Sequence, residues 1–210
     1  MKTENFVLRG MARESLKGKW GLAIGGYVLF MIISMVVNFI PVVGSIASLI
    51  ITGPLTLGLA IFSLSISRNQ EAKVGQIFDG FNHFGKALGT YLLMLLFIIL
   101  WSLLLIIPGI IAGISYSMTF YILADNPSIR AIEAIDRSKK MMYGYKWKFF
   151  LLQLSFIGWA LLCLLTFGIG FLWLVPYMQM SFAKFYDDVR GEQIKTEETP
   201  QVEVVTPTVA

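Results

Sequence analysis

Four long apolar stretches dominate this sequence and restrict what it can fold into. They cover residues 20–40, 45–67, 88–124 and 147–186. About 20 apolar residues in a helix, at about 1.5 Å rise per residue, cross the roughly 30 Å hydrocarbon core of a bilayer. The first two stretches fit one crossing each, whereas the last two are too long for one. We therefore expect a polytopic membrane protein.

The composition excludes a water-soluble domain. Hydrophobic residues make up 56% of the chain and charged residues 14%, whereas a soluble domain carries about 25% charged residues. The net charge is +4. Beside membrane spans, such a charge indicates contact with anionic lipid headgroups. We expect membrane lipids as partners, with a homo-oligomer or another membrane protein as further possibilities, and no nucleic acid.

Turn-forming residues divide the apolar stretches into hairpins. Pro41–Gly44 separates the first two, Pro108-Gly109 interrupts the third and residues 167–170 interrupt the fourth. The sequence predicts an all-α domain over residues 1–190, with six spans in three hairpins at about residues 20–67, 88–124 and 147–186. Because the spans after Gly109 and Gly170 are short, four spans with re-entrant turns remain an alternative. Pro54, Pro108 and Pro176 are candidates for breaking helices.

Charge placement predicts the orientation. None of the 17 Lys and Arg residues lies in the three turns. Because cytoplasmic loops carry the excess of Lys and Arg, we expect both termini and the two long connections in the cytoplasm, and the turns outside the cell membrane.

The connections have helical periodicity of their own. Residues 73–88 and 128–143 place apolar side chains on one face and charged ones on the other, which is typical of helices lying on a membrane surface. Residues 11–20 resemble a weaker third copy. The candidates for contact with lipid headgroups are Trp20, Arg130, Arg137, Lys139, Lys140, Lys146 and Trp147.

A shift of 61 residues aligns parts of the chain with one another. It places Ser48 on Gly109 and Gly170, and Tyr116 on Tyr177. Each unit would contain an interfacial helix, a span, a tight turn and a span. Because each unit starts on the same side, the sequence predicts three parallel repeats about an axis along the membrane normal.

No catalytic constellation is apparent. His83 is the only histidine and Cys163 the only cysteine, and neither has a ligand cluster near it in sequence. Asp125, Asp187 and Asp188 lie at span ends without an evident partner. We expect no metal, no cofactor and no enzymatic activity.

The last segment differs from the rest of the chain. Residues 191–210 contain four glutamates, one lysine and no helical apolar stripe. We expect this acidic cytoplasmic tail to be disordered.

Several motifs resemble a known family. They are the segments 12–20 (ARESLKGKW), 77–81 (IFDGF), 105–112 (LIIPGIIA), 121–127 (YILADNP), 138–142 (SKKMM), 146–147 (KW), 154–159 (LSFIGW) and 176–177 (PY). In order and spacing they are similar to DUF975, a family of integral membrane proteins common in Gram-positive bacteria, which is itself distantly similar to membrane domains of some glycerophosphodiester phosphodiesterases. The resemblance implies an integral membrane protein and carries no settled activity.

Two functions remain open from the sequence, and a third, a membrane-bound enzyme of lipid metabolism, is disfavoured because no catalytic cluster is present. The first is a non-enzymatic protein that acts through lipid or membrane-partner contacts in envelope maintenance. The alternative is a small transporter or channel, whose pathway polar span residues would line. Such residues more often bond neighbouring helices. The polar residues within the expected spans are Asn38, Thr52, Ser115, Ser117, Thr119, Gln153, Ser155 and Gln179.

Overall fold

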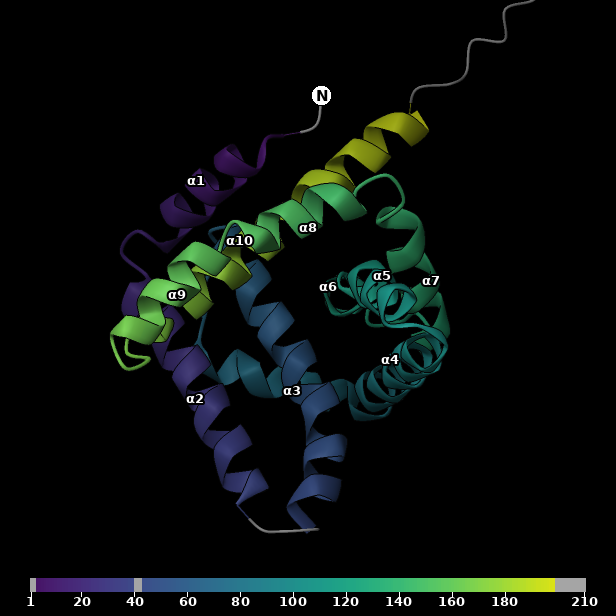
Figure 1. The fold of residues 1–210 in the computed structure, drawn as a ribbon, viewed down its shortest axis with the longest axis horizontal. Coiled ribbons are helices and arrows are strands. Elements are labelled where there is room, and N and C mark those ends of the chain that lie inside the picture. Colours follow the sequence, from purple (N-terminus) through teal and green to yellow (C-terminus); the bar gives the residue numbers. More distant parts are fainter. Residues whose placement is uncertain (1–2, 40–42, 199–210) are drawn as a thin grey trace, which may run out of the picture.

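The computed structural model describes residues 3–39 and 43–198, and all regular structure in them is helical (Figure 1). The elements are α1 Asn5–Leu16, α2 Trp20–Asn38, α3 Val43–Ser67, the 3₁₀ helix η1 Val74–His83, α4 Phe84–Leu104, α5 Ile106–Tyr116, α6 Thr119–Asp125, α7 Ala131–Met141, α8 Lys146–Leu154, α9 Ile157–Leu165 and α10 Phe171–Glu198. The all-helical prediction is confirmed.

Among the described residues, five helical segments are long and apolar enough to cross a membrane. They are Trp20–Asn38, Gly44–Ser67, Val74–Leu103, Ile106–Asp125 and Lys146–Leu165. Large apolar side chains are exposed along them, including Leu103 at 84% and Leu165 at 77%. A water-soluble protein rarely exposes so much contiguous apolar surface. The exposed apolar side chains are therefore compatible with a membrane protein.

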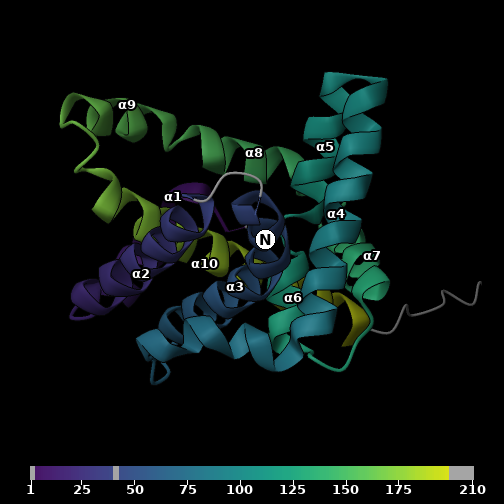
Figure 2. The same ribbon diagram turned by 90° about the horizontal axis from the view of Figure 1, so that it is seen from below.

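Three helix pairs form hairpins, α2–α3, α4–α5 and α9–α10, which point in different directions (Figures 1 and 2). A glycine lies against the preceding helix in each: Gly44 at Val37, Gly109 at Ser102 and Gly170 at Cys163. A Cβ at any of the three would collide with its neighbour. The missing side chain therefore lets the two helices of each hairpin approach closely.

The break in the second hairpin lies before Pro108 rather than at it. α4 ends at Leu104 and α5 begins at Ile106, with Leu105 in an extended conformation between them. Pro108 is thus in the first turn of α5, where a backbone N–H has no partner within the helix and its loss costs little. The prediction of a turn at Pro108-Gly109 is therefore wrong, because the chain breaks at Leu105.

Pro54 and Pro176 do not end helices either. α3 and α10 continue through them, so the prediction that they break helices is wrong. Both prolines are buried, and neighbouring elements can hold a helix together at a proline.

The segment around residues 73–88 packs on the bundle instead of lying free. η1 contacts α3 so closely that a Cβ at Gly58 would collide with the backbone of Ile77, and one at Gly80 with the backbone of Pro54. Its outer face carries Phe78 and Phe81, and Phe84 follows at the start of α4; neighbouring ring centroids in this row lie 6.4 and 6.3 Å apart. In a 3₁₀ helix side chains three residues apart eclipse each other, which produces this exposed aromatic row.

The predicted interfacial helix at residues 128–143 is α7, and it too packs inward. Ile135 and Met141 of the helix and Met142 just after it are buried, whereas Ile132 is 51% exposed and Tyr143 82%. Amphipathic periodicity is the same for a helix that faces a bundle and one that faces lipid.

The chain end differs from the prediction. α10 continues to Glu198, so the first part of the segment expected to be disordered is helical. Residues 199–210 lie outside the described part of the chain.

Candidate functional site

Five charged or hydroxyl-bearing side chains meet where the three hairpins join, and we call this group the ionic node. Its members are Arg68, Asp125, Tyr186, Asp187 and Arg190. Arg68 binds Asp125 through two hydrogen bonds of 2.7 and 2.9 Å, and it binds Asp187 at 2.8 and 3.1 Å. Paired guanidinium–carboxylate bonds of this kind are strong and fix geometry.

Within the node, Asp125 accepts hydrogen bonds from more side chains than Asp187 does. The Asp125 carboxylate also accepts hydrogen bonds from Arg190 at 2.6 Å and from Tyr186 at 2.9 Å. Its side chain is 10% exposed and that of Arg68 is 26% exposed. The hydrogen bond to Asp125 raises the pKa of Arg68, against the opposing effect of burial and with a further contribution from Asp187. Arg68 therefore keeps its charge throughout the accessible pH range.

Each hairpin contributes to the node from its second half. Arg68 follows α3, Asp125 ends α6, which continues the helix direction after α5, and Asp187 lies in α10. The node therefore connects all three hairpins at one end of the molecule, which we call the charged end.

A second ion pair lies nearby. Lys148 of α8 binds Asp188 of α10 at 2.9 Å, with both side chains 14% exposed. Thr3 also donates to Asp188, and Asn5 of α1 donates to the Lys148 carbonyl at 2.9 Å. These contacts hold α1, α8 and α10 together.

The expectation that Asp125, Asp187 and Asp188 have no partners is wrong. Their partners lie far away in sequence, so spacing could not reveal them. One signal was present: Arg68, Asp125 and Asp187 each stand directly after an apolar run at the same end of a hairpin.

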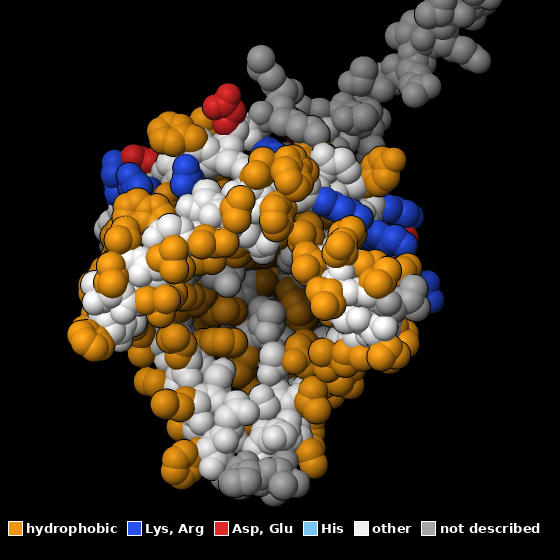
Figure 3. Space-filling model, viewed as in Figure 1, with side chains coloured by type: hydrophobic (Ala, Val, Ile, Leu, Met, Phe, Trp, Pro, Cys, Tyr) orange, Lys and Arg blue, Asp and Glu red, His pale blue; other side chains and the backbone are white. Residues whose placement is uncertain are grey.

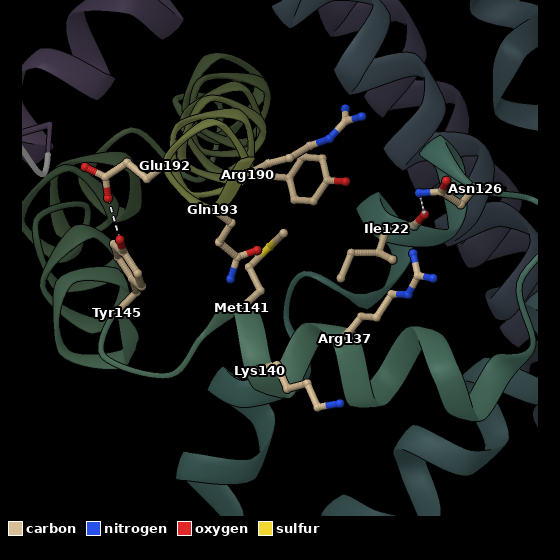
Figure 4. A pocket seen from close by; sticks show the side chains of 10 residues that line it. Ile122, Asn126, Arg137, Lys140, Met141, Tyr145, Arg190, Glu192 and Gln193 are labelled. Atoms are coloured by element: carbon tan, nitrogen blue, oxygen red, sulfur yellow. Dashed lines mark hydrogen bonds between the residues drawn. The ribbon is translucent and has the colours of Figure 1, made fainter. Parts of the chain in front are cut away.

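A cavity of about 690 Å³ opens beside the node, between α7 and α10, and we call it the basic pocket. Arg137 of α7 points into it and Arg190 of α10 lies across from it, while Lys140 lies at its edge (Figure 4). Glu192 is its one carboxylate, and Tyr145 donates a hydrogen bond to it. Burial, followed by this hydrogen bond, raises the pKa of Tyr145 to about 12. Each of these three cations is also paired with a carboxylate that does not line the pocket: Arg137 with Glu133, Lys140 with Asp136 and Arg190 with Asp125. The pairs of Arg137 and Lys140 are exposed, so an anion that enters the pocket can compete for them.

The predicted lipid-contact residues do not form one site. Arg137 and Lys140 line the basic pocket, whereas Lys139 and Lys146 line a cavity of about 190 Å³ near Trp101. The remaining three are separate again: Arg130 stands directly before α7 and makes no capping hydrogen bond with its side chain, Trp147 stacks on Phe150 with ring centroids 5.4 Å apart, and Trp20 lines a third, aromatic cavity.

Another cavity, of about 220 Å³, lies among the hairpins. Of the eight polar span residues singled out in the sequence, Ser117, Gln153 and Gln179 line it, and Thr56 joins them. Tyr121 donates a hydrogen bond of 3.3 Å to Gln179. We call this the central cavity; the sequence did not show that residues from three hairpins meet there.

In the part of the chain that the structure describes, no three of the His, Cys, Asp and Glu residues are placed to hold a metal ion. His83 ends η1 and Cys163 is buried in α9.

The fold and the charged end define an all-helical protein whose apolar helices are compatible with a membrane. The family model for a protein of unknown function, DUF975, matches residues 1–111 and 102–193, and the chain belongs to this family. No curated protein and no solved structure matches the chain. The more distant similarity to membrane domains of glycerophosphodiester phosphodiesterases stays a prediction.

Proposed function

We propose that this protein is a non-enzymatic integral membrane protein that binds anionic lipid headgroups at its charged end and acts in envelope maintenance. The basic pocket carries the proposal. Arg137 and Lys140 line it in exposed pairs with Glu133 and Asp136, and such exposed pairs are weak enough for a lipid phosphate to compete with them. Cationic side chains near an anionic leaflet contribute about 1 kcal/mol each. The cations on the visible face lie toward the same end, whereas the α2–α3 hairpin shows none (Figure 3).

Replacing both Arg137 and Lys140 with glutamine is expected to weaken binding of phosphatidylglycerol to the purified protein by about tenfold or more, at about 1 kcal/mol per cation. Native mass spectrometry of the protein with phosphatidylglycerol or phosphatidylcholine measures this. Folding should be little affected, because the pairs Arg137–Glu133 and Lys140–Asp136 are exposed.

The matched control removes the same charge elsewhere. Lys17 and Lys73 are exposed, are paired with Glu14 and Glu71, and lie outside the basic pocket. The double change to glutamine there should leave phosphatidylglycerol binding nearly unchanged. Equal loss in both double variants would show only general charge attraction and contradict the proposed site.

From the charge placement in the sequence we also propose six spans in three repeats, with both termini in the cytoplasm of the cell. The described arrangement differs from this topology, because the hairpins point in different directions and Gly170 of the α9–α10 turn lines one pocket with Arg13 and Trp20. The apolar first half of α10 would be the sixth span. The glycines that close the hairpins support the repeat, because Gly44, Gly109 and Gly170 each face the residue seven positions earlier. This equivalence replaces Ser48 by Gly44 in the sequence alignment of the first unit.

Cysteine labelling in intact cells tests the orientation. In a Cys163→Ser background, Phe167→Cys in the α9–α10 turn should react with a membrane-impermeant maleimide, because Phe167 is 99% exposed. Asp136→Cys on α7 should react only after the cells are opened. Labelling of Asp136→Cys in intact cells would contradict the orientation.

The central cavity favours a second function, transport of a small solute. Thr56, Ser117, Gln153 and Gln179 place polar groups from all three hairpins around it. Sealed proteoliposomes distinguish the two functions, since a lipid-binding protein should leave solute efflux at the level of empty vesicles. Protein-dependent efflux that Gln179→Leu abolishes would favour transport.

A further inference from the structure

Three tryptophans line one cavity, which we call the aromatic pocket. Trp20, Trp159 and Trp173 surround a volume of about 330 Å³ together with Arg13, Cys163, Gly170, Leu174 and Tyr177. The chain contains five tryptophans, so most of them lie here. The volume falls within the range of about 300–1,000 Å³ that small-molecule sites occupy.

The aromatic pocket opens on an apolar flank of the molecule. Trp159 and Trp173 are half-exposed, at 52% and 51%, and Leu161 and Leu162 on the same helix as Trp159 are also exposed. In a bilayer, this flank of α9 would face lipid, so an acyl chain can enter from the side. Tryptophan is well suited to this position because its ring is apolar and its N–H can remain near polar groups.

A cation without a counter-ion stands at the edge of this pocket. The guanidinium of Arg13 lies 5.6 Å from the centre of the Tyr177 ring, and no ion pair of Arg13 occurs among the described residues. Tyr177 and the indole rings are neutral, so the pocket presents uncompensated positive charge beside apolar walls.

Arg9, one helical turn before Arg13 on α1, adds to this positive stripe. Its buried Nε atom has no hydrogen-bond partner within the described structure. Asn5, one turn earlier still, contacts α8. Of these residues only Arg13 lines the aromatic pocket, so an anionic group there would be stabilised mainly by its guanidinium.

We propose that the aromatic pocket binds an anionic phospholipid from the surrounding bilayer, with part of an acyl chain between the tryptophans and the headgroup phosphate on Arg13. The apolar walls account for the chain, and the unpaired guanidinium accounts for the headgroup charge. This site is separate from the basic pocket and shares no lining residue with it. It rests on the membrane location of the proposed function but not on the basic pocket.

Tryptophan fluorescence tests the proposal directly, because a brominated acyl chain quenches an indole that it touches. In a Trp101→Phe, Trp147→Phe background the three remaining tryptophans all line the aromatic pocket. The protein is placed in phosphatidylcholine nanodiscs containing a small, equal fraction of brominated phosphatidylglycerol or brominated phosphatidylcholine. Phosphatidylglycerol should quench at a concentration about fivefold lower, as expected for one cation–phosphate contact.

Arg13→Gln should abolish this preference, whereas Arg13→Lys should retain most of it. Arg130→Gln, which removes a cation at the start of α7 outside this pocket, is the matched control and should retain it in full. Equal quenching by both lipids in the parent protein would overturn the proposal, even if Arg13→Gln failed to fold. A preference that survives Arg13→Gln would also overturn it, as would quenching by brominated oleate but not by brominated phosphatidylglycerol.

Discussion

Gly58→Ala and Gly80→Ala are each expected to destabilise the protein by about 3 kcal/mol or to prevent it from folding. At both positions a Cβ would collide with backbone atoms, those of Ile77 and of Pro54 respectively. Inserting one methyl group into a packed interior costs about 1–3 kcal/mol when neighbours can adjust. A backbone neighbour cannot rotate away, so we expect the upper end of this range.

The sign of the Gly58 effect separates packing from helix propensity. Alanine is favoured over glycine inside a helix by about 1 kcal/mol, so propensity alone predicts that Gly58→Ala stabilises α3. The collision outweighs that gain. Unfolding by increasing dodecyl sulfate in mixed micelles measures the net effect.

Matched glycines provide the controls. Nothing lies within 4 Å of a Cβ placed at Gly25 in α2, or at Gly75 and Gly85 next to the contact. Gly25→Ala should be neutral or stabilising by up to about 1 kcal/mol. If Gly58→Ala behaved like Gly25→Ala, η1 would not lie against α3 as described.

Much of the fold followed from the sequence because bilayer thickness restricts helix length. The long apolar stretches predicted helices able to cross a membrane, and the turn residues predicted hairpins. The errors came where tertiary packing overrides local preference. Pro54 and Pro176 are held inside helices by their surroundings, and the break expected at Pro108 moved to Leu105.

The sites were predictable only in part. The basic character of α7 pointed to Arg137 and Lys140, and both line the basic pocket. Periodicity could not show which way α7 faces, because a bundle and a lipid surface favour the same apolar stripe. The ionic node depends on contacts between distant segments, such as Arg68 with Asp187, which no local pattern encodes.

Arg68→Gln is expected to lower the free energy of unfolding by about 2–3 kcal/mol. Removing one partner of a buried ion pair costs about 3–5 kcal/mol because the other charge is left without compensation. Arg68 is partly exposed, so solvent reduces the effect. The loss is still large, because among the described residues Arg68 is the one cation that binds both Asp125 and Asp187.

Arg137→Gln is the matched control, since it removes an arginine from an exposed pair with Glu133 four residues away on the same helix. Such pairs contribute about 0.3–0.5 kcal/mol, so the two variants should differ severalfold in the same unfolding assay. Asp125→Asn should be destabilising as well, and combining it with Arg68→Gln should cost less than the sum of the two single changes, because both remove the same contact. If the stability losses of the two single variants were strictly additive, Arg68 and Asp125 would stabilise the protein independently. The three hairpins would then be held together by apolar packing rather than by the ionic node.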